Sequence, residues 1–171
     1  MMRSLLLLVP LSMLPAQSPP APIENEFVRV VYATDQPVAK PGALHEHKQN
    51  RVMIYLDPGD MQIRYADGRI DNQHWKAGEV AWSAAGGMHT SQNVSKAPIR
   101  IVEIEVRSPG VTSETVSRLF KPIIDNPQVL VYENTQAPAG RHYVAVDLKA
   151  GAAFWDRMPA GPGPFIITEL K

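Results

Sequence analysis

The sequence predicts an all-β protein, built as an antiparallel sandwich or barrel. Short runs rich in β-branched and aromatic residues recur along the chain with turn residues between them, which is the pattern of closely spaced antiparallel strands. Proline makes up 16 of the 171 residues, well above the usual ~5%, and prolines at this density interrupt helices and central strands. Hydrophobic residues account for 44% of the chain, so it can bury a core.

The first eighteen residues are typical of an export signal. Arg3 gives a positive start, residues 5–9 begin a short apolar run, and small or polar residues up to Ser18 suit a cleavage zone. The apolar run is too short to cross a bilayer, which takes ~20 residues. We therefore expect residues 1–18 to be a signal peptide and residues 19–24 a Pro-rich extended leader. The mature protein is expected to be secreted or periplasmic, and not bound to a membrane after signal removal.

Five strand candidates follow the leader. They are residues 27–32, 52–56, 61–65, 79–82 and 99–106. Asp57-Pro58-Gly59 is a turn after the second, and Asp67-Gly68 is a hairpin signal after the third. In the last candidate Ile and Val alternate with Arg and Glu, so we expect a buried Ile/Val face and a wet Arg/Glu face.

One short helix is expected after these strands. Thr112 or Ser113 can cap it, Val116 and Leu119 lie on its apolar side, and Pro122 ends it. Strands then resume at residues 129–133, 143–148 and 165–170. Residues 108–125 are therefore expected to be a helical connector.

Residues 126–171 resemble a degenerate, contracted copy of residues 25–107. Lys76-Ala77-Gly78 followed by Trp82 recurs as Lys149-Ala150-Gly151 followed by Trp155, with identical spacing. Two further matches keep the same order: Asn25 and Val28 with Asn126 and Val129, and Pro98, Ile101, Glu103 and Ile104 with Pro164, Ile167, Glu169 and Leu170. The copy contains one histidine, His142, so we expect it to supply strands but no metal. Both tryptophans are expected to be packing residues.

Charge and cysteine content exclude several classes of function. Lys+Arg and Asp+Glu number 17 each, which argues against nucleic-acid binding through phosphates and against attachment to anionic lipid. The chain has no cysteine, which excludes disulfides, zinc–thiolate sites and thiol nucleophiles. Any metal must therefore be held by His, Asp or Glu.

Three histidines stand where they could share a metal ion. His45 and His47 lie two positions apart, so on a strand both side chains project from the same face. His89 follows another strand candidate, with Gly86-Gly87 just before it, where the backbone can bend tightly at a barrel rim. His74 has no partner at a suitable spacing and is expected on the surface or in a hydrogen bond.

The segment around His89 carries the spacing of a known motif. Gly78, Ala84, Gly86, His89 and Asn93 fall at the positions of the second motif of the cupins, which runs Gly, five residues, Pro, one residue, Gly, two residues, His, three residues, Asn. Ala84 replaces the proline, and all spacings are kept. The sequence therefore resembles the cupins over residues 24–106, and most closely the small secreted single-domain cupins.

The first cupin motif is matched in part. His45-Glu46-His47 fits its His-x-His element, and Gly59 falls at its closing glycine. The metal-binding Glu expected four or five residues after His47 is Arg51 or Val52. Some cupin branches bind metal through three histidines without this glutamate.

The resemblance implies a cupin-type antiparallel β-barrel (a double-stranded β-helix or jelly roll) over residues 25–107, with extra C-terminal strands. It also implies that His45, His47 and His89 are the ligands of one divalent metal ion, and it does not distinguish Mn, Fe, Zn and Ni. On a strand, Glu46 would point away from both flanking histidines. Gln49 would be an oxygen donor if the chain turned after His47.

The expected function is to bind, or act on, a small molecule in the barrel mouth. An enzyme of this kind would be a metal-dependent isomerase, hydrolase or dioxygenase, and Tyr55 and Tyr65 are the candidates for a base on barrel strands. The alternative is a non-catalytic periplasmic module that binds a small ligand, with or without metal. In a third interpretation the barrel is a structural unit that forms a homodimer.

Overall fold

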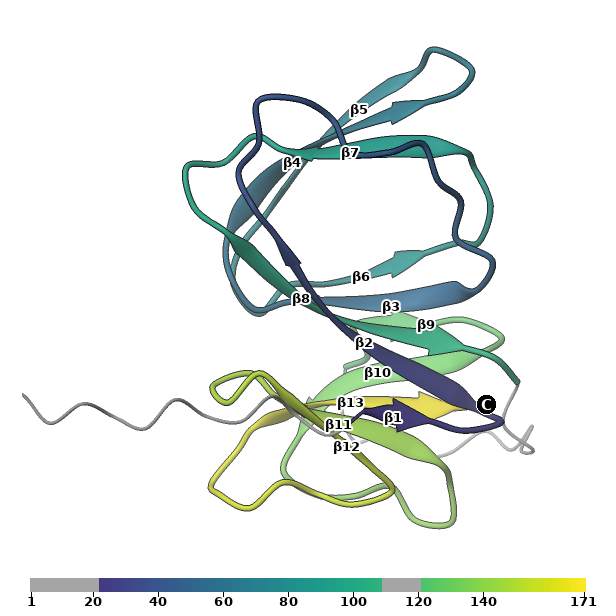
Figure 1. The fold of residues 1–171 in the computed structure, drawn as a ribbon. Coiled ribbons are helices and arrows are strands. Elements are labelled where there is room, and N and C mark those ends of the chain that lie inside the picture. The colour runs from purple at the N-terminus through teal and green to yellow at the C-terminus, as the bar shows by residue number, and fades with distance from the viewer. Residues whose placement is uncertain (1–21, 109–120) are drawn as a thin grey trace, which may run out of the picture.

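The computed structural model describes residues 22–108 and 121–171, and every regular element within them is a β-strand (Figure 1). The predicted export signal and residues 109–120 of the predicted helical connector lie outside these ranges, and residues 124–125 at the end of that connector form a short strand. No helix within them is long and apolar enough to cross a membrane. The strands are β1 (Ile23–Glu24), β2 (Val28–Asp35), β3 (Asn50–Tyr55), β4 (Gly59–Tyr65), β5 (Ile70–Trp75), β6 (Val80–Ser83), β7 (His89–Asn93), β8 (Ile99–Val106), β9 (Ile124–Asp125), β10 (Val129–Asn134), β11 (Tyr143–Asp147), β12 (Ala152–Trp155) and β13 (Phe165–Leu170).

The first part of the chain forms a barrel of two facing sheets (Figure 1). One sheet has the order β1-β2-β8-β3-β6 and the other has the order β5-β4-β7, with antiparallel neighbours throughout. Residues 37–45 run beside β7 and extend the second sheet, because Pro37 is bridged to Asn93 and His45 to His89.

The connections between the two sheets are those of a jelly roll. Residues 37–45 are counted here as a strand of the β5-β4-β7 sheet. From β2 to β8, the chain then crosses between the two sheets at every connection except the one from β4 to β5, which joins neighbours in the same sheet. Two interleaved Greek keys of this kind fold into two sheets that close on each other. The antiparallel jelly-roll barrel predicted from the sequence is therefore confirmed.

Strand β8 differs from its prediction, because it is covered on both faces. Val102 and Ile104 face outward, into an apolar cluster shared with a further sheet. Ile101 faces the inside of the barrel, and Glu103 lines the cavity there. The prediction of a wet Arg/Glu face was thus wrong for Glu103.

A five-stranded antiparallel sheet covers the outside of the β1-β2-β8-β3-β6 sheet (Figure 1). Its order is β12-β11-β13-β10-β9. The two sheets pack through one buried cluster, to which the barrel contributes Val28, Val30, Val52, Ile54, Val102, Ile104 and Val106, and the second sheet Val129, Val131, Val144, Val146, Ala153, Ile166 and Leu170. Burial of this apolar surface, at ~25 cal/mol per Å², stabilises the barrel from outside, so its inner face is left to line a cavity.

The two packed sheets share a strand order and begin with the same turn. Read from β9, the second sheet runs β9-β10-β13-β11-β12, which parallels β1-β2-β8-β3-β6. The Oδ1 atom of Asn25 accepts hydrogen bonds of 2.9 Å from the backbone N–H groups two and three positions later, and Asn126 does the same, also at 2.9 Å. These turns join β1 to β2 and β9 to β10.

The registers of the two sheets also match around the tryptophans. Val52 pairs with Trp82 in the barrel, and Val144 pairs with Trp155 in the second sheet. Both tryptophans pack against the cluster between the sheets, as expected.

The register of β13 differs from the sequence alignment by two residues. Val28 pairs with Val106, and its counterpart Val129 pairs with Leu170. Leu170 therefore takes the place of Val106 and not of Ile104. A shift of two residues keeps the same side chains on the same face of the strand, which is why the alignment still found the correct strands.

Candidate metal centre at the mouth of the barrel

The three histidines predicted as ligands lie side by side. His45 ends the segment that runs beside β7, His47 follows it by two residues, and His89 is the first residue of β7 itself. The ring centroid of His45 lies 4.6 Å from that of His89 and 4.9 Å from that of His47. One nitrogen from each ring lies within 4.8 Å of the other two.

A tight turn delivers His89 to this cluster. Gly86 and Gly87 have φ angles of 93° and 76°, a region that side-chain-bearing residues rarely adopt. The backbone N–H of Gly86 donates to the carbonyl of His47 over 2.8 Å. The two glycines before His89 are therefore required by the backbone conformation of this turn.

Backbone carbonyls fix the orientation of two of the imidazoles. Nδ1 of His45 lies 2.9 Å from the carbonyl oxygen of Ala43, and Nδ1 of His89 lies 2.6 Å from that of Gly87. A carbonyl can only accept, so Nδ1 carries the proton in each neutral ring and Nε2 presents a lone pair. Metal-binding histidines are held by this kind of hydrogen bond.

The donor atoms fit a metal ion. Nε2 of His45 lies 3.2 Å from Nε2 of His47. Two nitrogens that each bind one ion at ~2.0–2.1 Å are separated by about 2.9–3.4 Å at common coordination angles. In the metal-free protein, Nε2–H of His47 can donate to the lone pair on Nε2 of His45 across this distance, and a bound ion would take the place of that proton.

His47 is electrically suited to bind a cation without first losing a proton. Burial lowers its pKa to about 4, and the positive charges of Arg51, His45 and His89 add to this effect. At neutral pH His47 is therefore uncharged, which is the form that binds metal.

Arg51 stands where the cupin motif has a carboxylate ligand. Its side chain points into the barrel with 7% of its surface exposed, and Nη1 lies 2.7 Å from a carboxylate oxygen of Glu103. Nη2 donates to Oγ of Ser83 over 2.9 Å. Val52, the other residue at the motif position, is fully buried on the opposite side of the strand, between the two packed sheets.

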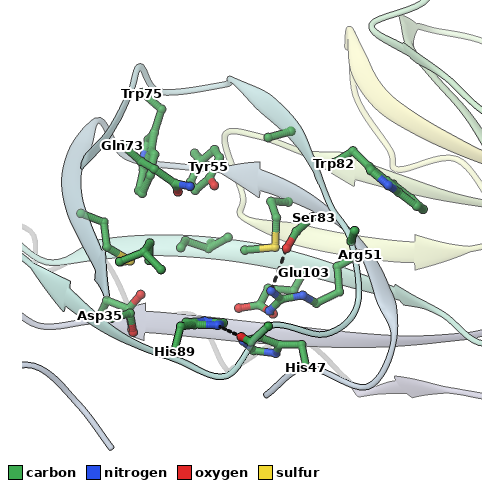
Figure 2. A pocket seen from close by; sticks show the side chains of 18 of the residues that line it. Asp35, His47, Arg51, Tyr55, Gln73, Trp75, Trp82, Ser83, His89 and Glu103 are labelled. Atoms are coloured by element: carbon green, nitrogen blue, oxygen red, sulfur yellow. Dashed lines mark hydrogen bonds and ion pairs between the residues drawn. The ribbon is translucent and has the colours of Figure 1, made fainter. Parts of the chain in front are cut away.

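The histidines open onto a cavity of about 850 Å³ inside the barrel (Figure 2). His47, Arg51, Glu103 and His89 gather at one side of it, whereas Tyr55, Gln73 and Trp75 lie together at the other (Figure 2). A cavity of this size suits a small-molecule ligand.

Asp35, at the end of β2, lines the same cavity. Burial raises the pKa of its carboxyl, while the charge of His45 lowers it. Asn93 holds this strand end in place, because its Nδ2 donates to the carbonyl of Asp35 over 2.8 Å and to that of Ala97 over 3.0 Å. Sequence analysis did not single out Asp35. It did single out Asn93, the motif residue that holds the backbone of Asp35 in place.

The two tyrosines considered as bases have different environments. The ring of Tyr55 stacks on Trp75, with centroids 3.9 Å apart. Burial and the charge of Glu103 raise the pKa of Tyr55 to about 12, so at neutral pH it is a hydrogen-bond donor and not a base. Tyr65 lies 5.8 Å from the ring of His89, and the guanidinium of Arg69 covers it at 3.6 Å.

The remaining candidates lie outside the cluster. Gln49 is exposed and is absent from the cavity lining, and Glu46 is exposed as expected. His74 is exposed and its Nδ1 lies 2.7 Å from a carboxylate oxygen of Asp60, in agreement with the sequence prediction. His142 pairs with Asp156 at 2.6 Å, in the second sheet.

Comparison with known proteins finds similarity at the level of structure. No family model and no curated protein matches the sequence. A cupin domain from Bordetella pertussis is 21% identical, with 54% of this chain and 100% of that chain covered and a TM-score of 0.46. An RmlC-like cupin family protein with a double-stranded β-helix fold, from Methanocaldococcus jannaschii, is 14% identical over 49% of this chain and 73% of that chain, with a TM-score of 0.40.

A third similar structure is an oxalate decarboxylase from Bacillus subtilis with Mn(II) centres. It is 22% identical, and the match covers 50% of this chain and 27% of that chain with a TM-score of 0.34. In each comparison about half of this chain is matched. The jelly-roll order of the strands and the grouping of the three histidines agree with the cupin-type barrel that the sequence predicts.

Proposed function

We propose that the barrel binds one divalent metal ion through Nε2 of His45, His47 and His89, and holds a small molecule in the adjoining cavity. The observation that carries this proposal is the convergence of three nitrogens within 4.8 Å of one another. It is supported by the two carbonyls that fix the rings of His45 and His89.

Three neutral imidazoles form a metal site with coordination positions left for a ligand. Imidazole nitrogens suit Zn, Fe and Ni. A bound ion of this kind supplies Lewis acidity toward an oxygen of the ligand, or redox chemistry. The reaction would accordingly belong to the isomerase, hydrolase or dioxygenase class.

The chain's own residues would bind and orient the ligand. Arg51 offers N–H groups beside the histidines, because its contacts with Glu103 and Ser83 use only part of its donor capacity. Tyr55 remains protonated at neutral pH, so it donates a hydrogen bond.

A metal-free binding module is the second candidate function. The observation that favours it is Arg51, whose positive charge stands where the cupin motif supplies a negative one. This charge weakens the attraction of the site for a cation. The three histidines would then line a ligand pocket without a metal.

Metal analysis of the purified protein separates the two functions. We expect about one equivalent of Zn, Mn, Fe or Ni after reconstitution, and loss of most of it in His45→Ala, His47→Ala or His89→Ala. His74→Ala is the matched control, since His74 is exposed, pairs with Asp60 and is not a member of the three-histidine cluster. Metal content that is far below one equivalent, or that does not respond to the three changes, would favour the metal-free module.

We also propose that residues 1–18 direct export and are removed near Ser18. Intact-mass measurement of protein exported by a bacterial host tests this, and a product outside the cytoplasm that retains Met1 would contradict it.

We further propose that residues 126–171 are a contracted copy that contributes a covering sheet and no metal ligand. The matching strand orders and turns support this proposal. His142→Ala should accordingly leave the metal content unchanged.

A further inference from the structure

The cavity has a polar side and an apolar side, and the polar side carries excess positive charge once a metal is bound. The neutral imidazoles of a three-histidine site leave both charges of a divalent ion uncompensated. Arg51 and Glu103 neutralise each other at 2.7 Å. The other carboxylate that lines this side of the cavity, Asp35, offsets at most one of the two charges of the ion.

Arg51 is positioned to receive an anion. Its almost fully buried side chain lines the cavity, and its hydrogen bonds to Glu103 and Ser83 use one N–H of Nη1 and one of Nη2, which leaves the second N–H of each nitrogen. Buried polar groups of this kind are costly unless they are satisfied. Guanidinium groups bind carboxylates with well-defined geometry, and a carboxylate beside Arg51 would also lie next to the metal site, since the charge of Arg51 acts on His47.

The opposite side of the cavity consists mainly of apolar side chains and includes an aromatic pair. Gln73 lies beside this pair (Figure 2), and Glu79, whose charge acts on Tyr55, also lines the cavity. The buried side chains of Met53, Met61, Ile63 and Ile101 form one cluster with Tyr55 and Trp75. All six line the cavity. The rings of Tyr55 and Trp75 already stack on each other at 3.9 Å, so together they present a rigid apolar wall.

We propose that the ligand of this cavity is an amphipathic carboxylate with an apolar body of about the size of a ring: the carboxylate binds at Arg51 and the metal, and the apolar body lies against the wall formed by Tyr55, Trp75 and the methionines. The contact between the carboxylate and the metal rests on the proposed function. The contact between the carboxylate and Arg51 does not depend on it.

Calorimetric titration of the purified full chain tests the proposal with three probes. 3-Phenylpropanoate has both features, 3-phenylpropan-1-ol lacks the charge, and acetate lacks the ring. We expect the metal-loaded protein to bind 3-phenylpropanoate at least about tenfold more tightly than either other probe. The metal-free protein should show the same preference for the acid over the alcohol, but a smaller one.

Two variants assign the effect to the two sides of the cavity. Arg51→Met/Glu103→Met replaces the ion pair by apolar side chains, a change that buried pairs often tolerate without loss of stability. It should weaken binding of the acid at least about tenfold and leave the alcohol unchanged. Met61→Gln should weaken binding of the acid several-fold and leave acetate unchanged. Arg64→Gln, on an exposed side chain of the same barrel, is the matched control.

The outcomes separate this inference from the proposed function. Equal affinity for acid and alcohol, or for acid and acetate, would overturn the inference even if the metal binds stoichiometrically. Failure of the metal to bind, with the acid still preferred and the preference lost in Arg51→Met/Glu103→Met, would overturn the proposed metal site and keep the anion site. Thermal melting of each variant shows that the fold is intact.

Discussion

His45 and His89 exchange two backbone hydrogen bonds, each 2.9 Å long. The pairing aligns the segment before β3 with the first residue of β7, so that the two rings lie 4.6 Å apart. The geometry of the cluster therefore depends on backbone bonds of the barrel, which are stiffer than side-chain contacts. A site held in this way is arranged before any metal arrives.

The first prediction concerns the pH dependence of stability in the metal-free protein. The pKa of His47 is about 4 in the folded protein, against ~6.5 in an unfolded chain. Between these values the unfolded chain takes up a proton that the folded protein does not. The metal-free protein should therefore lose stability as the pH falls from ~6.5 to about 4. His47→Gln should lose less over the same interval.

Urea unfolding at pH 7 and pH 4.5, with a chelator present, measures this difference. His74→Gln is the control, because His74 is exposed, and it should follow the parent protein. An identical pH dependence of the parent and His47→Gln would mean that His47 is not held in its neutral form by the folded protein.

The histidine cluster could be predicted from sequence, because its signals are local. The spacing of His45 and His47 sets their common face, and the two glycines before His89 set its turn. The side on which Arg51 lies could not be predicted. Strand β3 is apolar on both faces, with Met53 toward the cavity and Val52 toward the second sheet. The sequence of β3 therefore shows no alternation of polar and apolar residues that would tell which side chains face the cavity.

The same cause explains the wrong prediction for β8. A strand in a single-layered barrel would have one apolar face, and its charged face would meet water. Here the second sheet covers the outer face, so Ile104 is buried there while Glu103 lies inside with Arg51. The strand pattern of the second sheet was visible in the sequence, whereas its packing partner was not.

The second prediction restores the missing ligand. Arg51→Glu should tighten metal binding roughly tenfold or more, because position 51 faces the cavity and the change adds a carboxylate while removing a positive charge. Glu103 would be left beside a like charge, so Arg51→Glu/Glu103→Gln is the cleaner variant. Metal titration by calorimetry measures the effect, and Glu103→Gln alone is the control. Unchanged or weaker metal binding in the double variant would contradict the placement of Arg51 at the metal.

The third prediction is that Val52→Glu, one residue further on, disrupts the fold instead. Val52 is fully buried among apolar side chains between the two sheets. An unpaired carboxylate there costs about 3–5 kcal/mol. Chemical unfolding should show this loss, whereas Val52→Ile, which adds one apolar methylene to the same packed position, should cost less, about 1–3 kcal/mol. A stable Val52→Glu protein with tighter metal binding would show that β3 is turned the other way.

The fourth prediction concerns the second sheet. Ile166 is 2% exposed and belongs to the cluster that joins the sheet to the barrel. Ile166→Ala should lower the free energy of unfolding by about 2–5 kcal/mol. Ile123, in the same part of the chain, is 46% exposed, so Ile123→Ala should change it by less than about 0.5 kcal/mol.

Because the two sheets share one core, Ile166→Ala should shift a single unfolding transition of the whole protein. Far-ultraviolet circular dichroism and metal release, followed on the same sample, should report the same midpoint. Two separate transitions, with metal retained through the first, would mean that the second sheet unfolds independently of the barrel.

The last prediction tests the close contact between Gly59, the closing glycine of the first cupin motif, and Ile99. A Cβ atom on Gly59 would lie 2.5 Å from Cδ1 and 2.7 Å from Cγ1 of Ile99, which is fully buried. Gly59→Ala should therefore cost about 1–3 kcal/mol of stability through overpacking, and Ile99→Ala about 2–5 kcal/mol through the cavity that it leaves. In the double variant the new methyl group occupies part of that cavity and the clash with Ile99 is gone, so only the 3.3 Å contact with Oγ of Ser95 remains. Its loss should accordingly be smaller than the sum of the two single losses, by about 0.5–3 kcal/mol. Urea unfolding of the four proteins completes the cycle. Strict additivity would show that Gly59 is required for a reason other than its contact with Ile99.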